Sequence, residues 1–412
     1  MFRSDYGGRT MEEPAAKIEA PSLALQVQHA KFLVRVVAIG ALFLAIVGGL
    51  HFYVGQRLAT STGLAKPWST LIWNVVSMGV ALLFMAALGG RAFPRSIARV
   101  LQWAGFVWLG LFGLTLSGLA ISDGSLWGAG FFMPVDAGTH QIRSALVMAL
   151  VLPSLVWGFR VARNPRVKKI TVEIDALPEA FDGYRIVQLS DVHIGETLNR
   201  SFAANLTQQV NALAADVVAI TGDLVDGSVN KLKDEVEPFS KLQAKDGVYF
   251  VTGNHEYYHG GASWEAECES LGMIVLHNDH RVIDRQGAKL VIAGVPDVEG
   301  SRFSADHTPN IDRTFAGTPL GAPRILLAHQ PRFATSARNQ KVDLMLSGHT
   351  HAGQMFPFMF FVKLQQPVLE GLKVIHGVPT YTSPGTGYWG PPFRIGTQGE
   401  ITEITLRRLP SK

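Results

Sequence analysis

The chain has 412 residues, a net charge of +4 and a hydrophobic fraction of 47%, so it is long enough for two domains. Its single cysteine, Cys268, excludes a disulfide framework and makes cysteine an unsuitable main metal ligand. Much of the positive charge lies beside apolar segments, and no basic stripe interleaved with aromatics is present. This pattern favours membrane lipids as partners and gives no reason to expect a nucleic acid polymer.

Four apolar segments fill most of the first 160 residues. They are Val36–Val54, Leu71–Leu88, Val100–Ile121 and Ser144–Phe159. A helix that spans a bilayer needs about 20 mostly apolar residues. The first three segments meet this requirement, whereas the fourth is short and contains Pro153. The alternative is a set of buried core helices, but four segments separated by short loops favour membrane spans.

The number of Lys and Arg residues alternates between high and low in the stretches that flank these segments. They are Arg3, Arg9, Lys17, Lys31 and Arg35 up to the first segment, Arg57 and Lys66 in the first loop, Arg91, Arg95 and Arg99 in the second, Arg143 in the third, and Arg160, Arg163, Arg166, Lys168 and Lys169 after the fourth. Because Lys and Arg favour the cytoplasmic side of short loops, the pattern predicts that both termini are cytoplasmic. If the fourth segment does not span, the second half would face outward.

From about residue 170 onward, short apolar runs alternate with amphipathic patterns. The runs that suit buried strands are Tyr184–Ser190, Asp216–Thr221, Gly247–Thr252, Leu290–Val295, Arg324–Ala328 and Asp343–Ser347. The helical patterns are Arg200–Ala214, Asn230–Gln243, Ser263–Leu271 and Arg332–Asn339. Strands alternating with helices predict an α/β domain, in which ligands collect beyond the carboxyl ends of the strands.

Five polar motifs stand directly after apolar runs in this half. They are Asp191-Val192-His193, Gly222-Asp223-Leu224-Val225-Asp226, Gly253-Asn254-His255-Glu256, Ala328-His329-Gln330-Pro331 and Gly348-His349-Thr350-His351. Asp-x-His alone is a weak signal, and Gly-Asp-x-x-Asp alone could be a turn with a helix cap. The His-rich motifs are rarer, and all five at strand ends indicate one site.

The residue types in these motifs suit metal-dependent hydrolysis. His nitrogens and carboxylate oxygens bind Zn, Mn and Fe. Two such ions roughly 3.5–4 Å apart can hold a hydroxide between them and clamp a phosphoryl group for in-line attack. His255 could reach the leaving oxygen as a general acid, and Glu256 could hold its ring in the useful tautomer.

The second half resembles the calcineurin-like metallophosphoesterases, from about Lys168 to Arg408. The family pattern is Asp-x-His, Gly-Asp-x-x-Asp, Gly-Asn-His-Asp/Glu, a single His and Gly-His-x-His. Membrane-attached bacterial members are most similar, since their Tyr-Arg-Ile-Val-Gln-Leu-Ser-Asp-x-His and Gly-His-Thr-His-Ala-Gly-Gln signatures end here at His193 and Gln354. The chain departs from the pattern at Glu256, where many members have Asp, and at Pro384, where relatives often have Arg.

The resemblance implies a ligand set, a fold and a domain plan. A first divalent ion would be held by Asp191, His193, Asp223 and His351, and a second by Asp223, Asn254, His329 and His349, with His255 facing the substrate. The implied domain is a four-layer sandwich of two stacked mixed sheets flanked by helices. We therefore expect an N-terminal segment (1–32), a four-helix transmembrane region (33–160), a basic linker (161–169) and a phosphoesterase domain (170–412).

The substrate stays open at this point. The apolar run Met355–Phe361 follows His351 and is either a lip that enters the membrane surface or grips an acyl chain, or a buried strand or packed loop. We expect a multi-pass protein of a bacterial inner membrane that hydrolyses a phosphate ester or pyrophosphate bond, with a lipid-linked substrate as the hypothesis. The alternatives are a phosphodiesterase acting on soluble cyclic nucleotides and a non-catalytic membrane scaffold or sensor.

Overall fold

The computed structural model describes residues 23–130, 135–175 and 177–409. The expected N-terminal segment, 1–32, falls mostly on residues outside this part of the chain. Helix α1 (Leu23–Gly55) continues into a short π-helical turn, Gln56–Thr60. It is followed by α2 (Lys66–Ala92), α3 (Arg95–Ala129) and α4 (Ala137–Ala162). Among the described residues, those up to Tyr53 form one compact unit, and those from Val54 onward form a second.

The expectation of four long apolar helices is confirmed. Within the described residues, the stretches Val34–Thr60, Lys66–Leu88, Ser96–Gly128 and Ala137–Ala162 are long and apolar enough to cross a membrane. The short fourth segment of the sequence is the middle of a 26-residue helix that continues through Pro153. Its length therefore satisfies the requirement of about 20 residues for a span.

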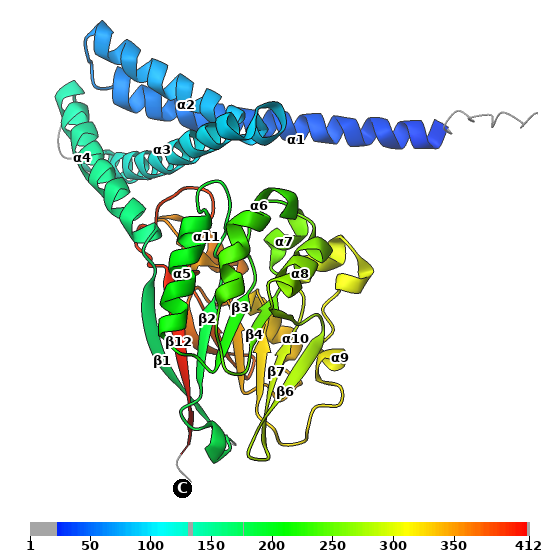
Figure 1. The fold of residues 1–412 in the computed structure, drawn as a ribbon. Helices are drawn as coiled ribbons and strands as arrows, with labels where there is room; N and C mark the ends of the chain where they lie inside the picture. Colours follow the sequence, from blue (N-terminus) through cyan, green and yellow to red (C-terminus); the bar gives the residue numbers. More distant parts are fainter. Residues whose placement is uncertain (1–22, 131–134, 176, 410–412) are drawn as a thin grey trace, which may run out of the picture. The chain divides into compact units, whose positions relative to one another are not determined.

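The chain after α4 forms two six-stranded mixed sheets (Figure 1). The first has the order β1 (Arg166–Ile174), β12 (Glu400–Arg408), β2 (Arg185–Leu189), β3 (Val217–Thr221), β4 (Val248–Val251) and β5 (Ile274–Val275). The second has the order β10 (Gly371–Ile375), β11 (Val378–Thr382), β9 (Leu344–Ser347), β8 (Arg324–Leu327), β7 (Ala288–Gly294) and β6 (Asp279–Arg285). All six predicted strands are present.

The helices of this domain are short and alternate with the strands along the chain. They are α5 (Arg200–Ala212), α6 (Val229–Val236), α7 (Asn254–Tyr258), α8 (Gly261–Ser270), α9 (Ile311–Phe315), α10 (Ala334–Ala337) and α11 (Phe358–Gln365). The prediction of one helix over Asn230–Gln243 is wrong: α6 ends at Val236, and Glu237–Lys241 forms a 3-10 turn. Pro238 explains the break, because proline has no N–H and disfavours helical backbone before it.

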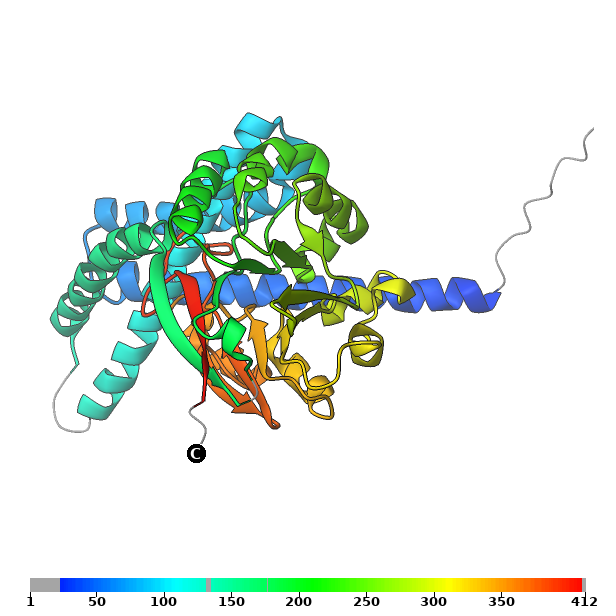
Figure 2. The ribbon, with the colours of Figure 1, turned by 60° about the horizontal axis from the view of Figure 1, so that its bottom comes forward.

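Three apolar layers hold the domain together. Side chains from α5, α6 and α8 pack on one face of β2, β3 and β4. The opposite faces of the two sheets pack against each other, for example Val217 and Ala219 of β3 with Ile325 and Leu327 of β8. Helices α9 and α10 cover the far face of the second sheet. Figure 2 shows the green strands of the first sheet facing the yellow and orange strands of the second. The predicted four-layer α/β sandwich is confirmed.

Helix α4 leads directly into the first sheet. It ends at Ala162, and β1 begins at Arg166, so the expected basic linker 161–169 contains the end of α4, a turn and the start of β1. Lys168 and Lys169 form ion pairs with Glu400 and Glu403 of β12. The backbone N–H of Arg394 donates to the carbonyl of Gly158 on α4 at 3.0 Å.

Candidate metal centre

The five polar motifs lie at the carboxyl ends of five strands, β2, β3, β4, β8 and β9. Strands β2, β3 and β4 run parallel to one another, as do β8 and β9, and the register pairs Leu189 with Ile220 and Ile220 with Phe250. The residues just beyond the strands are therefore level with one another. This common edge brings together side chains that are up to 160 positions apart in the sequence.

The backbone at this edge is strained at five of the proposed ligands. The φ angles are +53° at Asp191, +54° at His193, +52° at Asp223, +70° at His349 and +49° at His351. Residues other than glycine rarely adopt this left-handed region, and each such residue costs about 1–3 kcal/mol. Strained residues persist only where the surrounding structure fixes their backbone conformation. A cluster of them is typical of ligand-binding sites.

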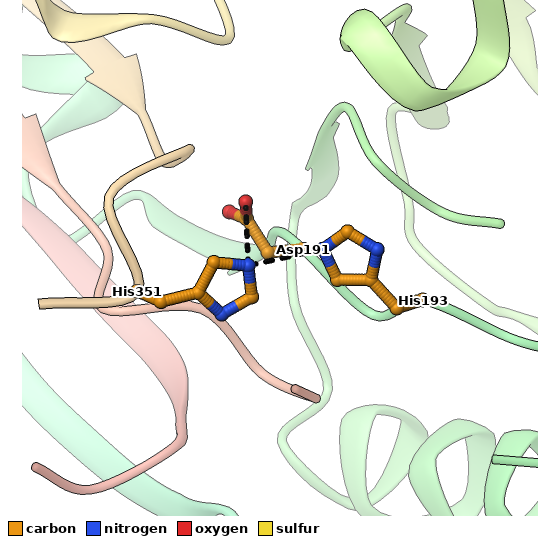
Figure 3. A group of neighbouring side chains, drawn as sticks. All are labelled: Asp191, His193 and His351. Carbon is orange, nitrogen blue, oxygen red and sulfur yellow. Dashed lines mark hydrogen bonds and ion pairs between the residues drawn. The ribbon is translucent and has the colours of Figure 1, made fainter. Parts of the chain in front are cut away.

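A first group consists of Asp191, His193 and His351 (Figure 3). The Nε2 atoms of His193 and His351 are 3.0 Å apart, and Nε2 of His351 lies 3.5 Å from Oδ1 of Asp191. Asp191 is fully buried and accepts hydrogen bonds from the Ser190 hydroxyl and the His349 backbone N–H. Two imidazole nitrogens and a carboxylate thus converge on one point.

A second group consists of Asp223, His329 and His349. Nε2 of His329 lies 3.2 Å from Nδ1 of His349 and 3.2 Å from Oδ2 of Asp223. The other nitrogen of His329, Nδ1, is 2.7 Å from the carbonyl oxygen of Thr221, which sets the orientation of the ring. The same Oδ2 atom of Asp223 is 3.9 Å from Nε2 of His193, so Asp223 stands between the two groups.

Asn254 begins α7 and is buried. Its side-chain oxygen has no hydrogen-bond partner within the described residues. A buried amide oxygen without a donor is costly unless a cation supplies the missing interaction. The lone oxygen therefore fits a metal ligand better than a structural role.

Two glycines leave no room for a side chain in these loops. A Cβ atom on Gly348 would lie 1.9 Å from the Ser190 hydroxyl oxygen and 2.1 Å from Oδ2 of Asp191. One on Gly253 would lie 2.1 Å from Oδ1 of Asp223. Glycine in the motifs thus lets the loops approach the carboxylates closely.

His255 faces the same centre, but its partner is not the predicted one. Nδ1 of His255 is 2.6 Å from Oδ1 of Asp226, and the same oxygen is 2.9 Å from Nδ1 of His193. Glu256 instead accepts backbone N–H groups of Gly253, Asp223 and Leu224. The expectation that Glu256 holds the ring of His255 is therefore corrected: Glu256 anchors the loops, and Asp226 orients both rings.

The charges of the site favour cation binding. Burial lowers the pKa of His349 to about 3 and holds the pKa of His351 well below its usual range, so both rings are neutral and keep a lone pair. Burial raises the pKa of Asp223, but His329 and His255 outweigh it and hold that pKa well below its usual range. The neutral rings of His349 and His351, the carboxylate of Asp223 and the unpaired oxygen of Asn254 are suitable donors for divalent ions.

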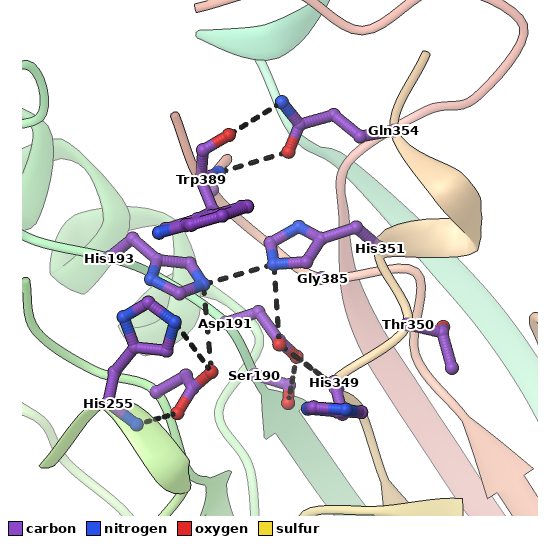
Figure 4. Close-up of polar contacts among 12 residues, drawn as sticks. Ser190, Asp191, His193, His255, His349, Thr350, His351, Gln354, Gly385 and Trp389 are labelled. Atoms are coloured by element: carbon purple, nitrogen blue, oxygen red, sulfur yellow. Dashed lines mark hydrogen bonds and ion pairs between the residues drawn. The ribbon is translucent and has the colours of Figure 1, made fainter. Parts of the chain in front are cut away.

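Several supporting residues were missed by sequence reasoning. The guanidinium of Arg394 is buried behind His351, with Nη2 3.3 Å from Nδ1 of the ring and 2.7 Å from the carbonyl oxygens of Pro384 and Gly387. Gln354 exchanges two hydrogen bonds with the backbone of Trp389 (Figure 4). Trp389 in turn lies edge-on to His255 at 5.8 Å. Gln354 belongs to the Gly-His-Thr-His-Ala-Gly-Gln motif, which is visible in the sequence. Nothing in the sequence marks Arg394 as a neighbour of His351.

The sequence is similar to those of known phosphoesterases. The family model for calcineurin-like phosphoesterases matches residues 184–353. A transmembrane protein with a metallophosphoesterase domain from Danio rerio is 38% identical over 273 residues, covering 64% of this chain and 62% of its own length. The solved structure of a 5'-nucleotidase precursor from Thermus thermophilus aligns over 54% of both chains with 14% identity and a TM-score of 0.36.

Coverage differs among these relatives. The chain spans less than two thirds of the Danio rerio protein, but it covers 92% of a metallophosphoesterase from Aquifex aeolicus at 30% identity over 244 residues, which is 59% of this chain. The predicted family, whose members are metal-dependent phosphoester hydrolases, is thereby confirmed: the chain belongs to the calcineurin-like phosphoesterases.

Proposed function

We propose that the protein is a membrane-anchored phosphoesterase that uses two divalent metal ions, Mn, Fe or Zn. The observation that carries this proposal is that two groups of ligand atoms lie next to each other. Oδ2 of Asp223 is 3.2 Å from Nε2 of His329 in its own group and 3.9 Å from Nε2 of His193 in the other. Asp191, His193, Asp223 and His351 would hold one ion. Asp223, Asn254, His329 and His349 would hold the other. Bound ions would supply Lewis acidity to the phosphoryl group and activate the attacking water.

The protein's own contribution is to place a proton donor beside that centre. The carboxylate of Asp226 holds Nδ1 of His255, so Nε2 faces Asp223 at 3.9 Å. Burial lowers the pKa of His255, but the carboxylates of Asp223 and Asp226 raise it to about 9. His255 is thus suited to protonate the leaving oxygen of a phosphate ester.

Removing single ligands tests the site. Asp223→Asn and His349→Ala should each abolish metal-dependent hydrolysis of an aryl phosphate ester by the full chain with Mn²⁺ present. Glu269→Gln, an exposed substitution on α8, is the matched control and should keep wild-type activity. Activity that survives both ligand substitutions would show that the site is wrongly placed.

We further propose that the substrate is linked to a lipid. Helix α11 begins seven residues after His351 and carries large apolar side chains on the surface, namely Phe358, Phe360, Phe361 and Leu364. Met355, just before α11, pairs with Ile395, and Ile395 lies against Gly158 of α4. The exposed apolar helix is thus close both to a proposed ligand and to a predicted span.

The rim of the centre is also aromatic. Tyr258 and Trp389 lie 5.3 Å and 5.8 Å from the ring of His255, and each is more than half exposed. Exposed aromatic side chains beside a polar centre suit a substrate with an apolar part next to its phosphate.

The lipid hypothesis predicts that changes on α11 affect hydrolysis of a lipid substrate but not of a soluble one. Moving one large apolar side chain from water into lipid is worth about 1.5–3 kcal/mol. Phe361→Ser with Leu364→Ser should therefore raise KM for a lipid phosphate in mixed micelles about tenfold or more, while kcat/KM for a soluble aryl phosphate stays unchanged. Leu320→Ser, at a residue 98% exposed, is the control. Equal activity on soluble cyclic nucleotides, or indifference to lipid, would favour the soluble-nucleotide alternative, and no hydrolysis at all would favour a scaffold.

The membrane orientation is a proposal of the same kind. With residues 33–160 as the membrane region and 170–412 as the phosphoesterase domain, four spans put both termini and the site on the cytoplasmic side of the inner membrane. A reporter fused after Lys412 that is active only outside the cytoplasm should be silent, and an active reporter would reverse this topology.

A further inference from the structure

A second cluster of metal-binding side chains lies outside the five motifs. It consists of Glu265 on α8, His277 between β5 and β6, and His307 in the 3-10 turn Ala305–His307. Each residue offers one ligand atom, and these atoms all lie within 4.8 Å of one another. Their side chains are 17%, 25% and 14% exposed, so the cluster is partly buried.

The environment of His277 fixes how its ring is used. Nε2 is 2.9 Å from the carbonyl oxygen of Asp306, and a carbonyl can only accept a hydrogen bond. Nδ1 is 2.7 Å from Oε1 of Glu265. The contact with Glu265 needs a positive charge between nitrogen and carboxylate: either a proton on Nδ1 of a charged ring that donates to both oxygens, or a metal cation held by the lone pair of Nδ1 and by Glu265. Histidines that bind metals usually donate their second N–H to a carbonyl or carboxylate in this way.

His307 completes the cluster from the other side. Its ring lies 4.6 Å from the ring of His277, and its Nδ1 is 3.9 Å from the same oxygen of Glu265. Zinc binds nitrogen and oxygen ligands at about 2.0–2.2 Å, so tetrahedral ligands stand about 3.4 Å apart. The separations of 2.7 Å and 3.9 Å lie on either side of that value, so small side-chain rotations would complete a zinc site.

We propose that Glu265, His277 and His307 bind a Zn²⁺ ion, with water in the fourth position. Two imidazoles and one carboxylate form a ligand set that zinc accepts in proteins. This ion is separate from the two of the phosphoesterase centre, and the proposal does not rest on the proposed function.

The position of the cluster gives the ion a structural role beside the catalytic centre. The ring of His307 packs edge-on against the ring of Tyr257 on α7, with the centroids 5.2 Å apart. Tyr257 stacks on Phe303, and Phe303 contacts Tyr258, whose ring faces His255. An ion that ties α8 to the turn at His307 would therefore stiffen the aromatic wall next to His255 without touching the substrate.

Zinc stoichiometry of the full chain in detergent tests the proposal. Asp223→Asn with His349→Ala provides a background in which the phosphoesterase centre is weakened. Adding His277→Ala to this background should lower the Zn²⁺ bound at equilibrium dialysis by one equivalent per chain. It should also remove a rise of a few degrees in Tm on adding Zn²⁺, because an ion that binds only the folded state stabilises it. His376→Asn, at an exposed histidine with φ +49°, is the control and should keep that equivalent.

Glu265→Gln guards against a folding defect in the alanine variant. It keeps the size of the side chain and removes the charge, so it should lose the same equivalent while its Tm without zinc stays near that of the background. If both variants bind as much zinc as the background, the cluster is only a hydrogen-bonded contact and the proposal is overturned.

Discussion

Asp226→Asn is the substitution that most sharply separates the roles in the candidate centre. Its Oδ1 atom contacts Nδ1 of both His193 and His255, at 2.9 Å and 2.6 Å. Asparagine keeps the shape of the side chain but loses the charge that supports a protonated His255. Outer partners of metal ligands typically contribute 10–100-fold, and a positioned proton donor about 10²–10⁴-fold. We therefore expect kcat for an aryl phosphate to fall about 10²-fold or more.

The assay is steady-state hydrolysis with saturating Mn²⁺ in a double-mutant cycle with His255→Ala. If Asp226 acts largely through His255, adding Asp226→Asn to His255→Ala should cost far less than Asp226→Asn alone, because only the effect on His193 remains. Equal losses in both backgrounds, or a kcat close to wild type, would refute this reasoning.

Glu256→Gln is the contrasting variant. The carboxylate of Glu256 accepts hydrogen bonds from three backbone N–H groups. The side chain of glutamine has only one oxygen, so it cannot accept all of these hydrogen bonds. A buried N–H left without an acceptor costs about 1–3 kcal/mol, so we expect a lower Tm with a smaller effect on kcat. A large loss of kcat at unchanged Tm would instead restore Glu256 as the partner of His255.

Three further predictions concern the loops, the ions and pH. Gly348→Ala should weaken metal binding about tenfold or more, because its Cβ would displace Asp191, whereas Gly113→Ala, which meets nothing within 4 Å, should not; metal titration compares them. Chelation should lower Tm and abolish activity, with both restored by Mn²⁺, because the ions hold strained loops; an unchanged Tm would contradict this. Burial raises the pKa of Asp216, but hydrogen bonds from Arg185, Arg285 and Lys245 lower it below its unfolded value of 3.8. Its contribution to stability is thus present above that value and is lost as pH falls below it, so the difference in free energy of unfolding between wild type and Asp216→Asn should shrink as pH falls below about 4.

The central strands could be predicted from the sequence, whereas the outer strands and the order within the sheets could not. Strands β2, β3 and β4 are mostly apolar, because both of their faces are buried. Strand β1 alternates exposed and buried residues and carries Arg166, Lys168 and Lys169, so its composition resembles a basic linker. Its pairing with β12, more than 230 positions away, has no local signal.

The candidate ligands could also be predicted, but their supporting contacts could not. His255 and Glu256 are neighbours in sequence, yet adjacent residues on a helix do not face each other, and both stand on α7. Because Glu256 could not be the partner of His255, a carboxylate from another motif was needed. The second Asp of Gly-Asp-x-x-Asp, Asp226, is that partner. Arg394 comes from a loop 43 residues beyond His351, and only the folded chain brings the two together.

Electron paramagnetic resonance of the Mn²⁺-loaded full chain tests the central claim most directly. Two Mn²⁺ ions bridged by Asp223 at roughly 3.5–4 Å should give a spin-coupled signal that disappears in Asp223→Asn together with phosphate release. A six-line signal of isolated Mn²⁺ in the active wild-type protein, unchanged by Asp223→Asn, would contradict a two-metal phosphoesterase centre.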